Sequence, residues 1–388
     1  MSDQRPKGII AWVRRRPMSW ASKLAALIGL AMVGAWGAGR WFNDDHLWSQ
    51  FLFWIPTLAV VVIGWVLVLV SGICSRMSLR MGGVMLRPFL ALACLLLTVW
   101  MLFGEWRVQR YFMPSDARPT DLRVVHWNMS VAQRARGAGD VILAQHPDVA
   151  LVVNIRTDDL RQSLYEQLAT LGGKPAEGES AGADVHFLNR GTLVVATRLP
   201  IRRWGVVALD AVESKLEEWR SGWDPGRVYF LELDTSGEAS MGGRPLIVWA
   251  LDLPSDPTMS RAEVMRAAAR AVKNWQGPVY APDGIGRWIP SDLVDVTPDE
   301  ATGFPKPDLV IGDFNTPRGS HSVRALVGDM DGAFAQAGRG AVGTWPRRFP
   351  LWQIDQAFVG GDVEATRYRI LNPGMSEHRM QVVDLRRE

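Results

Sequence analysis

Three long apolar runs fill most of the first hundred residues of the chain. They predict transmembrane helices at about residues 23–40, 51–73 and 86–105. The middle run is as long as the ~20 residues that a helix needs to cross a bilayer, and long basic side chains at the ends of the two shorter runs can extend to the interface. A buried helical hairpin of a soluble domain is the alternative. The pattern therefore predicts an N-terminal membrane region at residues 1–106.

Short apolar segments alternate with amphipathic stretches in the remainder of the chain. Residues 107–120 are rich in proline and polar residues and predict a linker. Residues 307–311 are typical of a buried strand, and residues 259–275 have the period of an Ala-rich helix with Ser260 as its N-cap. Two mixed β-sheets packed face to face, with helices outside, would satisfy this pattern at residues 121–388.

The charged residues are distributed unevenly along the chain. Residues 1–104 hold 10 Lys and Arg against 3 Asp and Glu, whereas the remainder holds 33 against 37. The basic residues of the first part lie before the first apolar run and between the second and the third, which predicts a cytoplasmic N-terminus by the positive-inside rule. Three crossings then give a multi-pass protein of the cytoplasmic (inner) membrane whose large C-terminal domain is extracytoplasmic (periplasmic).

The acidic balance of the large domain also restricts its ligands. A domain that binds duplex DNA normally carries a basic face that neutralises phosphates, and the most basic cluster here is the short pair Arg347-Arg348. The charge therefore argues against nucleic acid as a partner and favours a small or lipid phosphoester. Both cysteines, Cys74 and Cys94, belong to the membrane region, so the large domain forms no disulfide of its own.

A carboxylate and a carboxamide stand one residue apart behind the apolar segment 307–311. Asp313 and Asn315 are at positions i and i+2, so their side chains are expected to point the same way. Gly312 is expected to free the backbone to turn at the end of the strand. The alternative for an isolated Asp-x-Asn is an ordinary Asx turn.

Other polar residues lie at or inside predicted strands in a definite order. They are Asn128, Asn154, Asp355, and the pair Glu377-His378 before the last strand. With Gly-Asp-Phe-Asn at 312–315, this series resembles the endonuclease/exonuclease/phosphatase superfamily of metal-dependent phosphoesterases. Gly343-Thr344-Trp345-Pro346 is similar to the Thr-Trp-Pro element of that superfamily. The resemblance covers about residues 120–388 and implies an α/β fold, a four-layer sandwich of two mixed β-sheets flanked by helices.

The resemblance also implies a role for each residue in the hydrolysis of a phosphoester with Mg²⁺ or Mn²⁺. Asp313 would orient or deprotonate the attacking water, and Asn315 would hydrogen-bond a phosphoryl oxygen. His378 would contact the phosphate, with Asp355 fixing the tautomer of its ring. The residues at or near the metal-binding positions would be Asn128, Asn154, Asp252 and Glu377.

Several positions depart from the pattern of the superfamily. Asn154 replaces the main metal-binding Glu, which would weaken the metal site, because Mg²⁺ is usually held by only one or two protein carboxylates. Asp252 stands where the superfamily has a His, and it could restore the missing charge. Gln356 replaces the His of Ile-Asp-His, and Glu377 replaces an Asp. His126 is expected to face away from the cleft and to be structural.

Three functions follow from these residues. The first is a membrane-anchored, divalent-metal-dependent phosphoester hydrolase, of phosphodiesterase or phosphatase type, that acts outside the cytoplasmic membrane on a substrate such as a lipid headgroup. The second is a catalytically inactive relative that binds a phosphorylated ligand or a protein partner, as the substitutions at residues 154, 252 and 356 suggest. The third is a nuclease, which the acidic charge of the domain disfavours.

Overall fold

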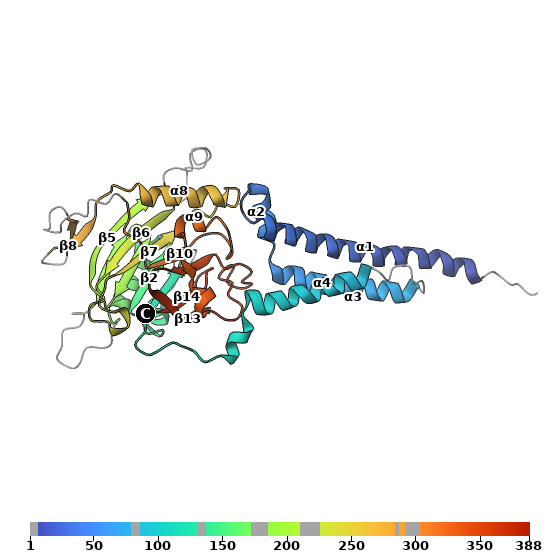
Figure 1. Ribbon diagram of the computed structural model, residues 1–388, viewed down its shortest axis with the longest axis horizontal. Helices are drawn as coiled ribbons and strands as arrows, with labels where there is room; N and C mark the ends of the chain where they lie inside the picture. The colour runs from blue at the N-terminus through green and yellow to red at the C-terminus, as the bar shows by residue number, and fades with distance from the viewer. Residues whose placement is uncertain are drawn as a thin grey trace, which may run out of the picture. The chain divides into compact units, whose positions relative to one another are not determined.

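The chain divides into two compact units in the computed structural model shown in Figure 1. Unit 1 is Met1–Val108 and unit 2 is Gln109–Glu388. The residues that the structure describes are 7–78, 86–130, 137–171, 185–209, 226–283, 287–291 and 303–388.

Unit 1 consists of apolar helices. Three helical segments are long and apolar enough to cross a membrane, at Trp20–Phe42, Thr57–Arg76 and Leu86–Glu105. Many of their leucine and isoleucine side chains, such as Leu69 and Leu96, are exposed on the unit. The helices are α1 Lys7–Phe42, α2 Leu47–Phe53, α3 Thr57–Ser78, α4 Leu86–Val99 and the π-helix η2 Trp100–Glu105.

The second apolar run does not form one helix. Helix α2 ends at Phe53 and α3 begins at Thr57, directly after Pro56. Proline has no backbone N–H and fits best just before or within the first turn of a helix. The break therefore falls where the sequence removes a hydrogen-bond donor, and the membrane-length helix starts later than residue 51.

Unit 2 contains two mixed β-sheets (Figure 1). The first sheet has the order β13-β14-β1-β2-β4-β3, and the second has the order β11-β12-β10-β7-β6-β5-β8-β9. The strands of the first sheet are β1 Leu122–Asn128, β2 Val149–Val153, β3 His186–Arg190, β4 Leu193–Thr197, β13 Val363–Leu371 and β14 Met380–Arg387. Those of the second are β5 Ile201–Ala208, β6 Arg227–Leu233, β7 Leu246–Asp252, β8 Tyr280–Pro282, β9 Trp288–Pro290, β10 Leu309–Asp313, β11 Asp331–Gly332 and β12 Asp355–Val359.

Alternation of side chains along the strands produces the four layers. Successive residues of a strand point to opposite faces of its sheet. Leu122 and Val124 of β1 pack between the two sheets with Val248 of β7. Val125 and Trp127 point to the other face and join a separate core. The predicted four-layer α/β sandwich of two mixed sheets flanked by helices is confirmed.

Helices cover the outer face of each sheet. The outer core of the first sheet includes apolar residues of α5 Ala138–Leu143 and α6 Asp158–Leu168, and that of the second includes residues of α8 Arg261–Lys273 and α9 Arg324–Val327. The hydroxyl of Ser260 accepts a hydrogen bond from the backbone N–H of Glu263 and caps α8, as the sequence predicts.

The segment that opens unit 2 is fixed to the sandwich by an arginine. Short helix η3 spans Val108–Phe112. The guanidinium of Arg110 donates to the carbonyls of Phe334, Ala335 and Gly338, at distances of 2.7 to 3.2 Å. These carbonyls belong to α10 Ala333–Ala337 and the residue after it, at the end of a helix where carbonyls have few partners within the helix. Part of the predicted linker 107–120 is therefore docked on the domain.

Candidate active site

Three aspartates lie in one row across neighbouring strands of the second sheet. Asp313 ends β10 and is paired in register with Asp252 of β7 on one side and with Asp355 of β12 on the other. Residues directly opposite one another on adjacent strands point to the same face and are ~5 Å apart. The strand register therefore places two of the predicted carboxylates beside Asp313.

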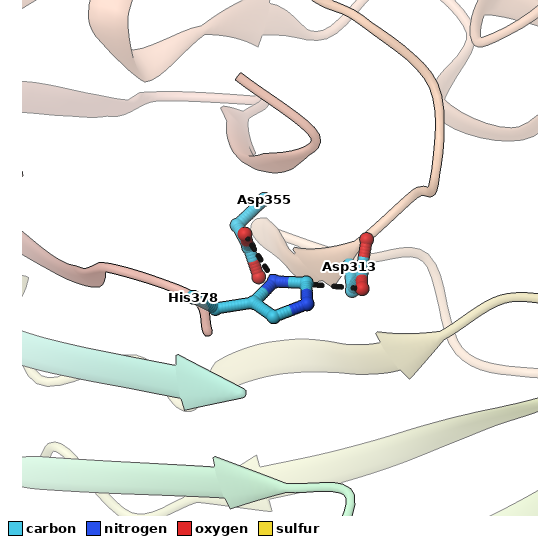
Figure 2. Close-up of side chains that lie close together, drawn as sticks. All are labelled: Asp313, Asp355 and His378. Atoms are coloured by element: carbon cyan, nitrogen blue, oxygen red, sulfur yellow. Dashed lines mark hydrogen bonds and ion pairs between the residues drawn. The ribbon is translucent and has the colours of Figure 1, made fainter. Parts of the chain in front are cut away.

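A buried histidine meets two of these carboxylates (Figure 2). Nδ1 of His378 lies 2.9 Å from Oδ2 of Asp355 and 3.8 Å from Oδ2 of Asp313. The three side chains are buried, with at most 6% of any of them exposed. His378 comes from the loop before β14, in the other sheet, so the group joins the two sheets at their strand ends.

Asp313 is held by two hydrogen bonds from neighbouring residues. Its Oδ1 accepts from the backbone N–H of Asn315 at 2.8 Å, and its Oδ2 accepts from Nδ2 of Asn128 at 2.9 Å. The first of these is an Asx turn. The two interpretations of the Asp-x-Asn sequence are thus compatible, because the turn fixes the carboxylate that faces His378.

Gly312 has a different role from the expected one. It lies inside β10 and not at a turn, with a φ of 155°. A Cβ atom at this position would overlap the backbone carbonyl of Leu251 on the neighbouring strand β7. The prediction that Gly312 frees the chain to turn is therefore wrong: the position needs glycine because two strands approach closely just before Asp313.

The other predicted residues lie around this group without joining it. Nδ2 of Asn315 donates to the carbonyl of Leu253 at 2.7 Å, which ties the ends of β7 and β10 together. Glu377 is half-buried beside His378. Among the described residues, the cluster whose possible ligand atoms lie within 4.8 Å of one another is Asp313, Asp355 and His378, so it includes neither Asp252 nor Glu377.

Asn154 has a cationic neighbour. It follows β2 with a φ of 63°, in the left-handed region that asparagine tolerates better than most residues. Its Oδ1 accepts a hydrogen bond from Nε of Arg156 at 2.9 Å. The superfamily pattern has a metal-binding carboxylate at this position, and here a neutral amide faces a guanidinium.

Two hydroxyl groups that the sequence analysis gave no role hold the site in place. Oγ1 of Thr344 accepts from the backbone N–H groups of Ile354 and Asp355, both at 3.1 Å. Oγ of Ser376 donates to the carbonyl of Asn128 at 2.6 Å and accepts from the backbone N–H of His378 at 3.1 Å. Thr344 belongs to the Thr-Trp-Pro element, and Ser376 directly precedes the pair Glu377-His378. These neighbours in the sequence were the available signal.

His126 lies on the same face of β1 as Asn128, between the sheets, so the expectation that it faces away is wrong. Residues 126 and 128 are two apart, and such residues share a face. Nδ1 of His126 is 3.0 Å from Nε2 of Gln381, whose Oε1 accepts from the hydroxyl of Tyr368 at 2.6 Å. The hydrogen bond agrees with the structural role expected for His126.

Burial and charge separate the pKa values of the site. Burial and the carboxylate of Asp355 raise the pKa of Asp313 to about 7. Burial disfavours the charged ring of His378, but the carboxylates of Asp355 and Asp313 outweigh it and raise the pKa to about 9. Burial also opposes ionisation of Asp355, yet the charge of His378 holds the pKa of that carboxyl below its ordinary value. At neutral pH, Asp355 and His378 form an ion pair and Asp313 is partly protonated.

The donor set of the site fits a divalent cation. The carboxylates of Asp313 and Asp355 offer oxygen atoms close together, and carboxylate oxygens are the preferred ligands of Mg²⁺ and Mn²⁺. The ring of His378 is protonated and bound to Asp355, so it has no lone pair free for a metal. Nδ2 of Asn128 donates to Asp313, and its Oδ1 accepts from the backbone N–H of Ser130 at 2.8 Å. The contact between Asn154 and Arg156 opposes a cation at this site, because the guanidinium is positively charged and occupies the amide oxygen of Asn154.

The fold and the site define a two-sheet α/β sandwich with a buried group of two aspartates and a histidine at its strand ends. The model of the Endonuclease/Exonuclease/phosphatase family matches residues 125–378, and the chain belongs to this family. Members of the family are phosphoesterases or nucleases and generally depend on a divalent metal.

Solved structures of bacterial proteins are similar in fold. One is an endonuclease/exonuclease/phosphatase family protein from Bacteroides thetaiotaomicron, 16% identical, over 70% of this chain and 99% of that one, with a TM-score of 0.46. Another is a mannosyl-6-phosphatase from the same species, 16% identical, over 68% and 99%, with a TM-score of 0.45. A third is an endonuclease/exonuclease/phosphatase from Beutenbergia cavernae, 18% identical, over 69% and 72%, with a TM-score of 0.43. No curated protein matches the chain.

Proposed function

We propose that this chain is a membrane-anchored phosphoester hydrolase, of phosphodiesterase or phosphatase type, that uses Mg²⁺ or Mn²⁺ outside the cytoplasmic membrane. The observation that carries the proposal is the position of Asp313 beside the buried Asp355–His378 ion pair. In this arrangement, the carboxylate of Asp313 changes protonation near neutral pH, and the positively charged ring of His378 is held in place by Asp355.

The two parts of the site perform different steps. His378 is positively charged at neutral pH and binds a phosphoryl oxygen, while Asp355 occupies its Nδ1 and keeps the ring charged and oriented. Asp313 accepts the proton of the attacking water, and a base is most effective when its pKa lies near the working pH. Asn315 is the proposed neutral hydrogen-bond donor to the phosphate.

A bound divalent cation supplies charge stabilisation on the phosphoryl oxygens and lowers the pKa of water. The residues that would hold it are Asp313 and its predicted neighbours Asn128, Asn154, Asp252 and Glu377. With a neutral residue at 154, the main metal-binding carboxylate of the family pattern is absent, and Asp252 lies outside the cluster of close ligand atoms. We therefore expect weak metal binding, which makes activity dependent on the free metal concentration.

Membrane anchorage is supported by unit 1. Its three apolar segments are long enough to span a bilayer, and several of their large apolar side chains are exposed on the isolated unit. The basic residues before the first segment and after the second favour a cytoplasmic N-terminus and an extracytoplasmic unit 2. A phosphoester in or near the membrane, such as a lipid headgroup, is the proposed substrate class.

The test uses the full-length protein in detergent micelles with bis(4-nitrophenyl) phosphate and 4-nitrophenyl phosphate. We expect release of nitrophenolate that requires Mg²⁺ or Mn²⁺ and stops with a chelator. Asp313→Asn and His378→Asn should each lower kcat/KM by roughly 100-fold or more. Matched controls are Asp331→Asn and His321→Asn, which change exposed residues of unit 2. Equal activity in all four variants would contradict the proposed site.

A catalytically inactive relative is the second candidate, and the contact of Arg156 with Asn154 favours it. A guanidinium beside a neutral amide, where the family has a metal-binding carboxylate, could bind a phosphorylated ligand without activating water. In that case the wild-type protein shows no turnover with either metal. Calorimetric titration with a soluble phosphorylated headgroup such as glycerol phosphate would still show binding, and His378→Asn would weaken it.

A further inference from the structure

Large exposed apolar side chains are concentrated in two places among the described residues of unit 2. One place is the segment that follows the third membrane-length helix, with Tyr111, Phe112 and Met113. The other is the loop before β12. The remaining exposed aromatic residue, Tyr165, packs its ring against Phe187 with centroids 4.3 Å apart. The loop before β12 is the one that borders the site.

This loop is a small hairpin, residues 344–352. Trp345 and Trp352 form an antiparallel bridge, each donating its backbone N–H to the carbonyl of the other at 3.0 Å. Their rings lie 5.5 Å apart. Phe349, at the turn, is 76% exposed, and Leu351 and Trp345 are each 38% exposed. The hairpin therefore presents aromatic and aliphatic side chains at its tip.

The same hairpin carries positive charge. Arg347 and Arg348 lie in its turn, and the guanidinium of Arg379 donates to the carbonyl of Arg347. In the part of the chain that the structure describes, none of these three arginines forms a salt bridge with an acidic side chain. Exposed aromatic residues beside arginines are typical of surfaces that lie at the interface of an anionic bilayer.

Hydrogen bonds connect the hairpin to both halves of the catalytic group. At its base, Thr344 accepts from the backbone N–H of Asp355 at 3.1 Å. The carbonyl of Thr344 also accepts from the N–H of Arg379 at 2.9 Å, and the N–H of Arg347 donates to the carbonyl of Glu377 at 2.8 Å. A surface that binds the tip is therefore held near the residues that contact the phosphate.

The small size of the tip favours a bilayer over a protein partner. A stable protein interface buries ~20–30 residues a side, whereas the exposed apolar surface here consists of three side chains in one turn. Insertion of single aromatic side chains into a headgroup layer needs no such area. The anionic headgroups also complement the charge of Arg347 and Arg348, in a domain whose overall balance is acidic.

We propose that hairpin 344–352 docks on the surface of an anionic phospholipid bilayer, with Phe349, Leu351 and Trp345 at the headgroup boundary and Arg347 and Arg348 on lipid phosphates. The docking brings the base of the hairpin, which is hydrogen-bonded to Asp355 and to Arg379 beside His378, near the headgroup layer. This inference rests on the proposed membrane anchorage and does not require the proposed hydrolysis.

The experiment uses the full-length chain in lipid nanodiscs. Both native cysteines are changed to alanine, Phe349→Cys is labelled with an environment-sensitive fluorophore, and the bilayer contains a spin-labelled quencher lipid. The discs consist of phosphatidylcholine alone or with phosphatidylglycerol. We expect a blue shift and quenching at residue 349 that are stronger in the anionic discs. The same label at Tyr165→Cys, an exposed aromatic position away from both the hairpin and the segment 111–113, should show little quenching.

Charge variants test the contribution of the arginines. Each arginine near an anionic surface contributes roughly a fivefold factor to affinity at physiological salt. Arg347→Gln with Arg348→Gln should therefore remove most of the preference for anionic discs, as should high salt. The matched control is Arg266→Gln with Arg270→Gln, which removes two exposed arginines of α8.

The outcomes separate the docking of the hairpin from the proposed membrane anchorage and from the proposed hydrolysis. A chain that does not insert into nanodiscs contradicts the anchorage and with it the docking. Inserted protein without quenching at residue 349, or with equal quenching in both kinds of disc, overturns the docking. A blue shift without lipid quenching indicates contact with protein, either a second copy or unit 1, and also overturns it. None of these readouts depends on turnover.

Discussion

Asp313 and Asp355 are opposite residues of the antiparallel strands β10 and β12, and their Oδ2 atoms lie 3.8 and 2.9 Å from the same nitrogen of His378. Two neighbouring carboxylates cannot both ionise easily in a buried site. The one closer to the imidazole keeps its charge, and the other has a pKa raised to about 7. The separation of their pKa values assigns a positioning role to Asp355 and a base role to Asp313.

The first prediction concerns the pH dependence of hydrolysis. Asp313 acts when it is deprotonated, so kcat/KM should rise with pH through its pKa of about 7. His378 acts when it is protonated, so activity should fall as the pH passes its pKa of about 9. The measurement is a pH–rate profile of the full-length protein.

Higher metal concentration should move the acidic limb of this profile to lower pH, because a bound cation stabilises the ionised form of Asp313. Asp355→Asn should move the alkaline limb to lower pH, since it removes the charge that raises the pKa of His378. An alkaline limb that stays in place in this variant would exclude His378 as its source.

The second prediction concerns Gly312. Gly312→Ala places a Cβ against the carbonyl of Leu251 on β7, and neither backbone can move without breaking the pairing of two central strands. We expect a loss of roughly 4 kcal/mol or more in the free energy of unfolding, measured by chemical denaturation. The matched control is Gly237→Ala, because a Cβ there meets no atom within 4 Å. Its effect should stay within about 0.5 kcal/mol.

The third prediction concerns stability in acid. Burial lowers the pKa of His126 to about 4, against an ordinary value of 6.5. Below pH 6.5 the unfolded chain binds a proton at this residue and the folded chain does not, so stability that is fully present above 6.5 is lost as the pH falls toward 4. The loss is roughly 1–3 kcal/mol.

His126→Gln keeps an acceptor for Gln381 and removes the titration, so the free energy of unfolding should depend less on pH between 6.5 and 4. Denaturation of unit 2, followed in the full-length protein across this range, measures the slope. His321→Gln, an exposed control, should leave the slope unchanged. Equal slopes for the wild type and His126→Gln would refute the assignment.

The fourth prediction concerns the missing carboxylate. Asn154→Asp restores a negative charge at a backbone position that aspartate can also adopt, and it should tighten Mn²⁺ binding on the order of tenfold. Arg156 competes for that charge, so adding Arg156→Gln should tighten binding further. Calorimetric titration with Mn²⁺ measures both effects. Unchanged affinity in the double variant would place the cation elsewhere.

Local sequence determined the elements and much of the architecture of this protein. The three membrane-length helices follow from the length and composition of each run, and the strands and the capped helix α8 follow from short-range periodicity. The alternation of apolar strands with amphipathic helices is compatible with the two-sheet sandwich, which the resemblance to the family implied. These features depend on neighbours within about one turn or one strand, which a sequence displays directly.

Only the tertiary structure decided which side chains meet. Asp313 faces Asp355 and His378 because of strand pairing between distant segments. The need for glycine at residue 312 comes from the backbone of β7, and the partner of His126 is Gln381 in another strand. A one-residue change of register would turn each of these side chains to the opposite face. Register is set by pairing over the whole sheet, and for this reason the residues of the site could be listed from the sequence but most of their contacts could not. The contact of Asp355 with His378 was expected beforehand, through the resemblance to the family.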